Sequence, residues 1–174
     1  MEKILLRYNG KIKKGIRIII SSILNNFTEK IWNKLLDIET LIYICKPIAT
    51  FKTGTKDKYI KWELNKEYIF KLFIYWFIPF GNHKILLEKI DEENKIIISK
   101  EHNNIVKIWN HKIKIEDKGE NIIKYTDEIE LYAGVFTLFI AIWGIMFYKH
   151  RQKKWKKIVK TFSAGSCNSA TPNC

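Results

Sequence analysis

The chain of 174 residues suits one domain with a sizeable hydrophobic core, and its 47% hydrophobic and 14% aromatic content excludes a disordered protein. Its 31 Lys and Arg residues against 18 Asp and Glu residues give a formal net charge of +13. That charge fits either a generally basic, solvated surface or an anionic partner such as a membrane. The sequence has no arginine-rich arm, zinc-finger spacing or RNA-binding aromatic motif, so we do not expect a nucleic-acid partner.

The cysteines and the N-terminus indicate the compartment. Cys45 lies in an apolar segment, whereas Cys167 and Cys174 lie at the far end of the chain, so no disulfide framework spans the domain. The N-terminus lacks the apolar core and small-residue cleavage site of a signal peptide. The longest apolar run, residues 135–147, is shorter than the roughly 20 residues of a spanning helix. We therefore expect a soluble, cytoplasmic protein, and the sequence indicates no metal site and no cofactor.

The first third of the chain predicts a strand, two short helices and a second strand. Asn25 or Asn26 can cap the first helix, in which Ile31, Trp32 and Leu35 recur at helical spacing. The second helix must end before Pro47, because the residue before a proline is pushed out of helical geometry. We expect strands at residues 16–21 and 49–53, the second helix at 38–44 and an exposed polar turn at 54–58.

A series of strands separated by short polar turns follows. Strands spaced this closely pair as an antiparallel sheet, so the whole order predicts an α+β domain with its helices on one side of a curved sheet. The predicted strands are residues 68–77, 83–90, 95–101, 105–116 and 122–132, with breaks at 79–81, 91–94, 102–104 and 117–121.

The last part of the domain changes from strand to helix. Residues 135–160 predict one long apolar and basic helix, and the preceding strands offer the only large surface for its apolar side. This geometry favours a cavity between helix and sheet. We divide the chain into an N-terminal extension at residues 1–15, a ligand-binding domain at 16–160 and a flexible tail at 161–174.

The order of elements and several motifs resemble the START-like, helix-grip superfamily, also called SRPBCC. The matching segments are Ile31-Trp32, LDIETLIYICKPIATF (36–51), FIPFGNH (77–83), IWNHKIKI (108–115), YTDEIELYAG (125–134) and FYKHRQKKW (147–155). The resemblance implies a long final helix that closes a cavity for sterols, lipids, polyketides or other apolar molecules. The superfamily also includes polyketide cyclase- and dehydratase-like enzymes, so the resemblance is compatible with catalysis as well.

The hairpin of residues 105–116 and 122–132 permits a prediction of register. If its turn centres on Gly119, His111 faces Asp127 and Trp109 faces Ile129. Tyr125 lies on the same inward face, whereas the alternate face carries lysines and glutamates and belongs in water. The His111 and Asp127 pair is a candidate for general acid-base catalysis, for anchoring a polar ligand group, or for plain structural hydrogen bonding.

Other candidate ligand-binding residues lie on neighbouring elements. Glu101 has the same parity as Ser99, so Glu101 and the nearby His83 either face inward or, as is common near strand ends, are solvated. Trp76 continues the apolar face of residues 70, 72 and 74, which is either core or cavity lining.

On the long helix, Phe139, Trp143, Phe147 and His150 recur at spacings of three or four, so we expect this stripe, which also includes Met146, to roof the cavity. The end of the helix is strongly basic and has an aromatic residue, Trp155. It is either a solvated helix end or a contact with an anionic membrane. The candidate contact residues are Arg151, Lys153, Lys154, Lys156 and Lys157.

The tail from Thr161 is small and polar and has no charged side chain. Three interpretations of the tail are open. It is a disordered extension, or it is the core of a thioether-crosslinked peptide carried behind a leader domain, or it is a remnant of cloning or of a shifted reading frame. Its serines and threonines alternate with Cys167 and Cys174, which is the pattern of such a peptide.

The preferred hypothesis is a non-enzymatic protein that binds one apolar or amphipathic, lipid- or polyketide-like molecule between sheet and helix. The second is a cyclase- or dehydratase-like enzyme that uses His111 and Asp127. The third is a peripheral membrane or carrier protein that contacts anionic lipid weakly. The sequence indicates neither the ligand nor the oligomeric state.

Overall fold

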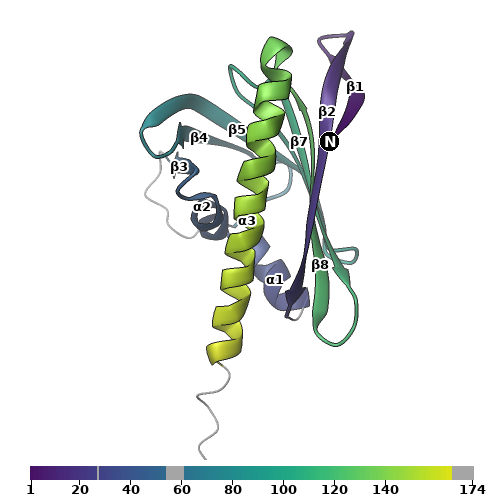
Figure 1. Cartoon of the computed structure of the whole chain (residues 1–174), viewed down its shortest axis with the longest axis vertical. Helices are drawn as coiled ribbons and strands as arrows, with labels where there is room; N and C mark the ends of the chain where they lie inside the picture. Colours follow the sequence, from purple (N-terminus) through teal and green to yellow (C-terminus); the bar gives the residue numbers. More distant parts are fainter. Residues whose placement is uncertain (27, 54–60, 166–174) are drawn as a thin grey trace, which may run out of the picture.

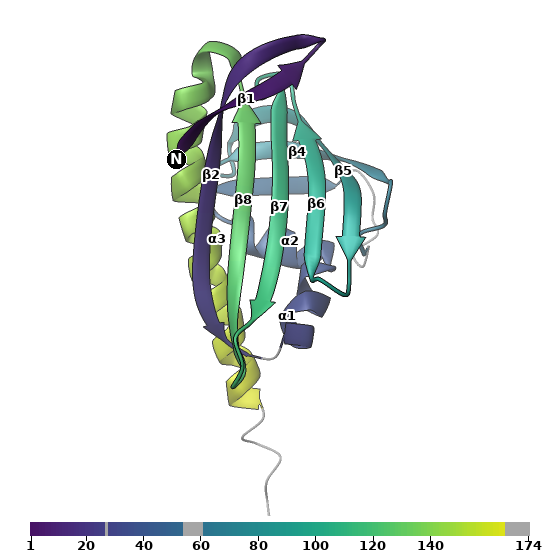
Figure 2. The same ribbon diagram turned by 90° about the vertical axis from the view of Figure 1, so that its right-hand side faces the viewer.

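The structure is a computed structural model that describes residues 1–26, 28–53 and 61–165. Antiparallel strands form one curved sheet in the order β1-β2-β8-β7-β6-β5-β4-β3, and the helices lie on one side of it (Figures 1 and 2). The predicted α+β, helix-grip architecture is therefore confirmed. The strands are β1 (Glu2–Tyr8), β2 (Lys11–Asn25), β3 (Ala49–Thr53), β4 (Glu67–Ile74), β5 (Ile78–Asp91), β6 (Ile96–His102), β7 (Ile108–Asp117) and β8 (Ile122–Tyr132). The helices are α1 (Thr28–Leu35), α2 (Ile38–Cys45), a 3-10 turn η1 (Gly134–Phe136) and α3 (Thr137–Gly165).

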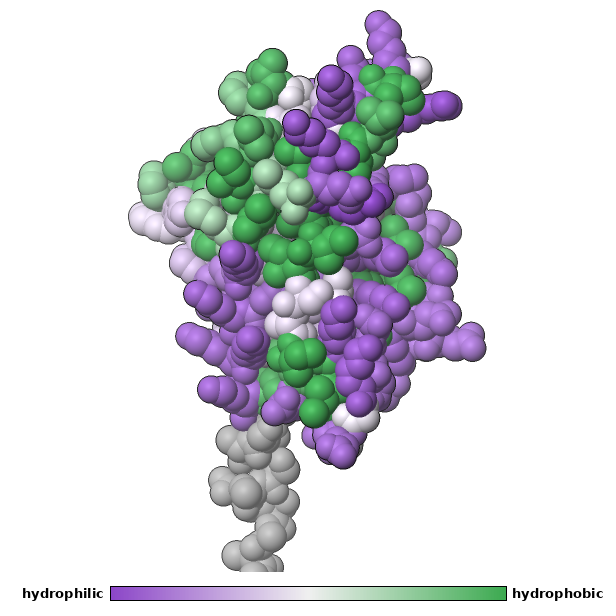
Figure 3. All heavy atoms as spheres, turned by 45° about the vertical axis from the view of Figure 1, so that its right-hand side comes forward, coloured by the Kyte–Doolittle hydropathy of each residue, from purple (hydrophilic) through white to green (hydrophobic). Residues whose placement is uncertain are grey.

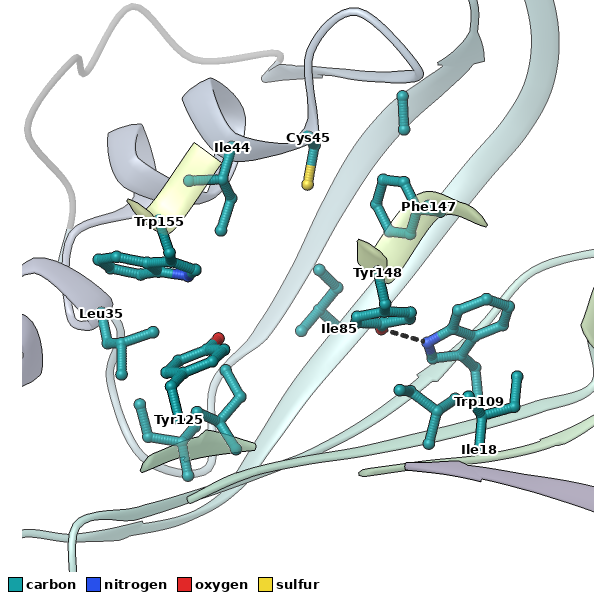
Figure 4. Close-up of a cluster of buried hydrophobic side chains, with 14 of the residues drawn as sticks. Ile18, Leu35, Ile44, Cys45, Ile85, Trp109, Tyr125, Phe147, Tyr148 and Trp155 are labelled. Carbon is teal, nitrogen blue, oxygen red and sulfur yellow. Dashed lines mark hydrogen bonds between the residues drawn. The ribbon is translucent and has the colours of Figure 1, made fainter. Parts of the chain in front are cut away.

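Strands β7 and β8 alternate strictly between buried and partly exposed side chains, as expected for a sheet with one covered face. The inward side chains pack against α3. Trp109 of β7 donates a hydrogen bond from Nε1 to the hydroxyl of Tyr148 on α3 at 3.0 Å (Figure 4). The ring of Tyr125 on β8 lies 5.5 Å from that of Trp155 on α3. The outward face is charged, as predicted.

The β7–β8 hairpin differs from the predicted register by two residues. His111 pairs with Ile129 and Ile113 pairs with Asp127, so the prediction that His111 faces Asp127 directly is wrong. The turn is the reason, because the amide of Lys118 donates to the carbonyl of Ile122 at 2.8 Å and the loop therefore centres on residue 120. A displacement of two leaves every side chain on its predicted face.

The chain reverses between β4 and β5 earlier than predicted. Residues 79–81, which we expected to break the sheet, lie inside β5, and the turn is formed at residues 75–77. Tyr75 and Trp76 there have positive φ values of 47° and 63°. The pairing shifts between Leu72 and Phe73, opposite Pro79–Gly81, and such a bulge accommodates the missing N–H of Pro79.

The ends of the described chain are more regular than expected. The predicted strand at 16–21 is part of β2, and β1 pairs with β2 inside the segment that we expected to be an extension. Helix α3 continues to Gly165, so residues 161–165 of the predicted flexible tail are helical. The polar turn at 54–58, Cys167 and Cys174 lie outside the described residues.

The buried face of α3 overlaps the predicted stripe only in part, although Phe139, Trp143 and Phe147 do line the cavity. The buried residues include Tyr148, Arg151, Gln152 and Trp155, which recur at spacings of three and four. Of the predicted stripe, Phe147 is buried and Trp143 is half-buried, whereas Phe139 and Met146 are exposed. His150, also half-buried, hydrogen-bonds the carbonyl of Lys46 at 2.7 Å. The phase of a helix depends on its tertiary partners, and here a carboxylate on β8 attracts the polar pair at 151 and 152 inward.

Candidate ligand-binding cavity

A cavity of about 350 Å³ lies between the sheet, α2 and α3. Its walls are mainly apolar and are contributed by Leu41 and Ile44 of α2, Leu72 and Ile85 of the sheet, and Phe147 of α3. Small-molecule sites have this size and character. The space holds on the order of ten water-sized groups.

The structure brings six of the nine predicted ligand-binding residues to this cavity. Those that line it are Glu101, Trp109, His111, Phe139, Trp143 and Phe147. Tyr125 and Asp127 are buried behind the lining rather than in it. Trp76 lies in the β4–β5 turn with 69% of its surface exposed, so its predicted place on the inward face is wrong.

His111 and Asp127 form a buried hydrogen bond, although they are diagonal rather than direct neighbours. The distance from His111 Nε2 to Asp127 Oδ1 is 2.8 Å. The same oxygen accepts from the Tyr125 hydroxyl at 3.2 Å, and Oδ2 accepts from Gln152 Nε2 at 2.7 Å. Ser22 of β2 in turn donates to the Gln152 carbonyl oxygen. Both carboxylate oxygens of Asp127 therefore accept hydrogen bonds from the protein interior, which favours a structural role over the other two predicted roles.

A second carboxylate, Glu101 of β6, lies on the cavity wall. Its Oε2 lies 2.8 Å from His83 Nε2, and its Oε1 accepts from Ser99 Oγ at 2.7 Å. Oε1 also lies 3.7 Å from His111 Nδ1. His83 and Glu101 therefore face inward, which was one of two placements that the sequence left open, and both ring nitrogens of His111 face carboxylates.

The pKa directions in this cluster favour charged groups. Burial opposes the charge of Asp127, but Arg151 and the hydrogen bond from His111 outweigh it and lower the Asp127 pKa. The pKa of Glu101 is likewise lowered against the effect of burial, by His111 and His83. Burial acts to lower the pKa of His111, yet the hydrogen bond to Asp127 and the proximity of Glu101 raise it overall.

Arg151 of α3 is the unexpected member of the site. We expected it on the surface, but only 3% of it is exposed, and its guanidinium borders the cavity. Its Nη2 lies 3.8 Å from Asp127 Oδ1, too far for a hydrogen bond, and its Cζ lies 4.8 Å from the centre of the Tyr148 ring. The guanidinium makes no hydrogen bond to another described residue, and its Nε is fully buried without a partner. Buried polar groups are almost always hydrogen-bonded, so these donors need an acceptor.

Arg151, Gln152 and Tyr148 were not predicted to be interior residues. A signal was present, because Tyr148 and Trp155 are aromatic residues two helical turns apart and place residues 151 and 152 between them on one face. Because Arg151 is positively charged, we predicted that it lies on the surface despite that signal.

The remaining basic residues at the end of α3 are placed as predicted. Lys153, Lys156 and Lys157 are exposed, and Lys154 is half-buried, with its Nζ 4.8 Å from the centre of the Tyr43 ring. Trp155, which would lie at the interface if this helix end met a membrane, is instead fully buried. A contact of this helix end with an anionic membrane stays a prediction for the lysines alone.

Among the described residues, we find neither a reactive cysteine, nor a metal site, nor a membrane-spanning helix. Burial raises the pKa of the Cys45 thiol to about 12, which keeps it neutral. The described part of the chain has no cluster of His, Cys, Asp and Glu that could hold a metal ion. Among the same residues, no helix is long and apolar enough to cross a membrane.

Comparisons with known proteins identify the architecture. No family model matches the sequence, and no curated protein matches it. A START superfamily protein from Mycobacterium smegmatis superposes with a TM-score of 0.63 at 10% identity, covering 84% of this chain and 98% of that one. The chain has the START-like fold.

Two further structures share this START-like fold. A protein from Chromobacterium violaceum has a TM-score of 0.64 at 10% identity, with 82% of this chain and 96% of that one covered. Norcoclaurine synthase from Thalictrum flavum, a point mutant in complex with a transition-state analogue, has a TM-score of 0.59 at 12% identity, with 86% and 98% covered. At such identities the START-like likeness establishes the fold and leaves the ligand open.

Proposed function

We propose that this protein binds one amphipathic small molecule, whose apolar body fills the cavity under α3. The proposal rests on an apolar cavity bordered by the buried guanidinium of Arg151. Among the described residues, none accepts a hydrogen bond from this guanidinium. Proteins with this fold commonly bind hydrophobic ligands.

The chemistry of the walls supports an oxygen-bearing polar end on the ligand. Arg151 carries donors in a planar fork that suits a carboxylate or a similar pair of acceptor oxygens. The oxygens of Glu101 and Asp127 are already engaged by His83, Ser99, His111, Tyr125 and Gln152, so the cluster offers few acceptors. A ligand with acceptor oxygens therefore fits better than one that carries an ammonium group.

Titration with matched probes tests this proposal. Dodecanoate and dodecanol share an apolar chain and differ at the polar end, and the fluorescence of Trp109 and Trp143 in the cavity wall reports their binding. We expect both to bind and dodecanoate to bind about tenfold more tightly, because a hydrogen bond to a charged group contributes about 1.5–3 kcal/mol. Arg151→Gln should remove that preference. Failure of both probes to bind would contradict the proposal.

A matched control separates the cavity from the surface charge. Lys153→Gln removes a positive charge from the same helix on its exposed side. It should leave the preference for dodecanoate unchanged. If Lys153→Gln and Arg151→Gln had equal effects, the preference would come from net charge and not from the cavity.

A second candidate is a cyclase- or dehydratase-like enzyme in which His111 exchanges a proton with the bound molecule. The observation that favours it is a cavity-lining histidine of raised pKa between two carboxylates. Both ring nitrogens already face those carboxylates, and Asp127 does not line the cavity, which favours binding over catalysis. A variant His111→Gln that binds the probes as well as the unchanged protein, together with no chemical change in any copurified ligand on incubation, would exclude this second candidate.

A further inference from the structure

The mouth of the cavity is surrounded by exposed apolar side chains. Of the residues that line the cavity, Tyr75, Ile78 and Phe139 are exposed, so the opening lies between the β4–β5 turn and the first turns of α3. Further exposed apolar residues flank both sides of the opening. They are Trp76 and Phe77 in the turn, and Val135, Phe136, Leu138 and Ile142 in η1 and α3.

These two segments carry no charge. Residues 72–82 and 131–148 contain no Asp, Glu, Lys, Arg or His. Val135 is 92% exposed and Phe139 is 70% exposed, which is costly in water unless a partner covers them. Figure 3 shows the apolar side chains gathered at the end of the molecule where α3 begins.

Cationic side chains border this surface. The ring of Tyr8, in the β1–β2 hairpin, lies 5.9 Å from that of Tyr132, which ends β8 just before η1. Arg7, Lys11 and Lys14 extend from that hairpin and are exposed. Figure 1 shows the tip of the hairpin and the start of α3 at the same end of the molecule. Lys107 is exposed there as well, and its amide donates to the carbonyl of Tyr132 at 2.9 Å.

We propose that this end of the molecule, which we call the mouth surface (residues 75–78 and 135–142 with Arg7, Lys11, Lys14 and Lys107), docks on an anionic lipid membrane. Exposed aromatic rings beside lysine and arginine are the composition of a membrane-interface surface. Docking in this orientation places the cavity opening against the lipid, so an apolar ligand enters or leaves without crossing water.

Charge favours a membrane over a second copy of the chain. Two copies that met symmetrically at the mouth surface would bring two sets of the same cations together, which opposes association. An anionic bilayer complements the cations and covers the apolar residues at once. This surface lies at the end of α3 opposite to Lys153, Lys154, Lys156 and Lys157, for which a solvated helix end and a membrane contact were both open predictions.

Vesicle flotation tests the docking surface, using phosphatidylcholine vesicles with and without phosphatidylglycerol. We expect binding to the anionic vesicles that weakens with salt, and little binding to the neutral ones. The double variant Trp76→Ser with Phe136→Ser should lower the affinity by about tenfold or more, because both side chains leave water on docking. The control Ile19→Ser with Ile23→Ser changes two exposed residues of β2 away from this surface and should have no effect.

Removal of charge locates the docking end. Replacing Arg7, Lys11 and Lys14 by Gln should lower affinity for the anionic vesicles by about fivefold for each charge removed. Replacing Lys153, Lys156 and Lys157 by Gln removes the same charge at the far end of α3 and should have little effect. Probe binding in the cavity stays measurable in every variant, so failure of docking is distinct from failure of ligand binding.

Three results would overturn the proposal. The first is that the unchanged protein does not float with anionic vesicles. The second is that the lysines at the far end of α3, and not Arg7, Lys11 and Lys14, are needed for binding to those vesicles. The third is a concentration-dependent dimer that Trp76→Ser with Phe136→Ser dissociates, which would assign the surface to a second copy of the chain.

Discussion

Asp127 shows how a single side chain organises the interior of this protein. It has no exposed surface and accepts hydrogen bonds from His111, Tyr125 and Gln152, which come from β7, β8 and α3. Its charge also faces Arg151. One carboxylate therefore ties the long helix to the sheet beside the cavity.

Replacing this carboxylate by an amide should destabilise the fold. Asp127→Asn offers one acceptor oxygen in place of two and removes the charge that His111 and Arg151 face, so we expect a loss of about 1–3 kcal/mol of unfolding free energy. The matched control is Glu128→Gln on the solvated face, where ion pairs contribute less than about 1 kcal/mol. Urea unfolding of both variants measures the difference. Equal, small losses would show that the Asp127 network contributes nothing.

The same cluster predicts how stability depends on pH. The pKa values of Glu101 and Asp127 lie below their ordinary values of 4.5 and 3.8, so their contribution is present above those values and is lost as pH falls. The pKa of His111 lies above 6.5, so its contribution is present below 6.5 and is lost as pH rises through the folded-state pKa. The cluster should stabilise most between about pH 4.5 and 6.5.

Urea midpoints of the unchanged protein and of His111→Gln, measured from within that pH range to well above pH 6.5, test this expectation. The difference between the two should be largest below pH 6.5 and should shrink at higher pH. A difference that grows as pH rises would show that His111 is held neutral in the folded state.

Residue parity predicted much of the site but could not predict all of it. His111, Asp127 and Glu101 were placed on the inward face because strand side chains alternate with period two. The burial of Arg151 was not predicted, because a basic helix end is usually solvated. Its burial depends on Asp127, a residue of another element that is distant in the sequence.

The two hairpins show that the local sequence predicts strands better than it predicts the position of the turn between them. The β7–β8 strands were predicted at nearly their observed bounds, but a glycine alone did not locate the turn, since Glu120 and Asn121 also have positive φ. In the β4–β5 turn, Tyr75 and Trp76 adopt positive φ values where Pro79 and Gly81 offered the stronger sequence signal. The exposed aromatic residues in that turn belong to the proposed docking surface, and local turn preference does not account for them.

Two glycines should respond oppositely to alanine. At Gly15 of β2, an added Cβ would lie 2.8 Å from the carbonyl oxygen of Leu131 and 2.5 Å from Leu6 Cδ1. At Gly144 of α3, it would meet Ile18 and Trp109 at an ordinary 3.5 Å. We expect Gly15→Ala to cost about 1–3 kcal/mol and Gly144→Ala to stabilise by up to about 1 kcal/mol. Thermal unfolding compares the two, and a stabilising Gly15→Ala would show that β1, β2 and β8 pack differently.

The order of helices and strands along the chain was the strongest predictor of the fold. Strand, two short helices, several strands and one long helix lead to a sheet gripped by a helix, because the helix has only one large apolar surface to cover. The hairpin of β1 and β2 and the exposed apolar mouth were not predicted. Both depend on which faces the assembled sheet and helix leave uncovered, and this is decided only in three dimensions.

Isothermal titration calorimetry with dodecanoate measures whether the cavity under α3 holds one amphipathic molecule. We predict saturable binding of one molecule per chain, with a negative change in heat capacity because apolar surface is buried. Ala49→Phe, which places a large side chain on the cavity wall, should abolish this binding while circular dichroism shows the fold retained. Weak uptake of many molecules per chain, or no binding by the unchanged protein, would show that the cavity is not a site for one amphipathic molecule.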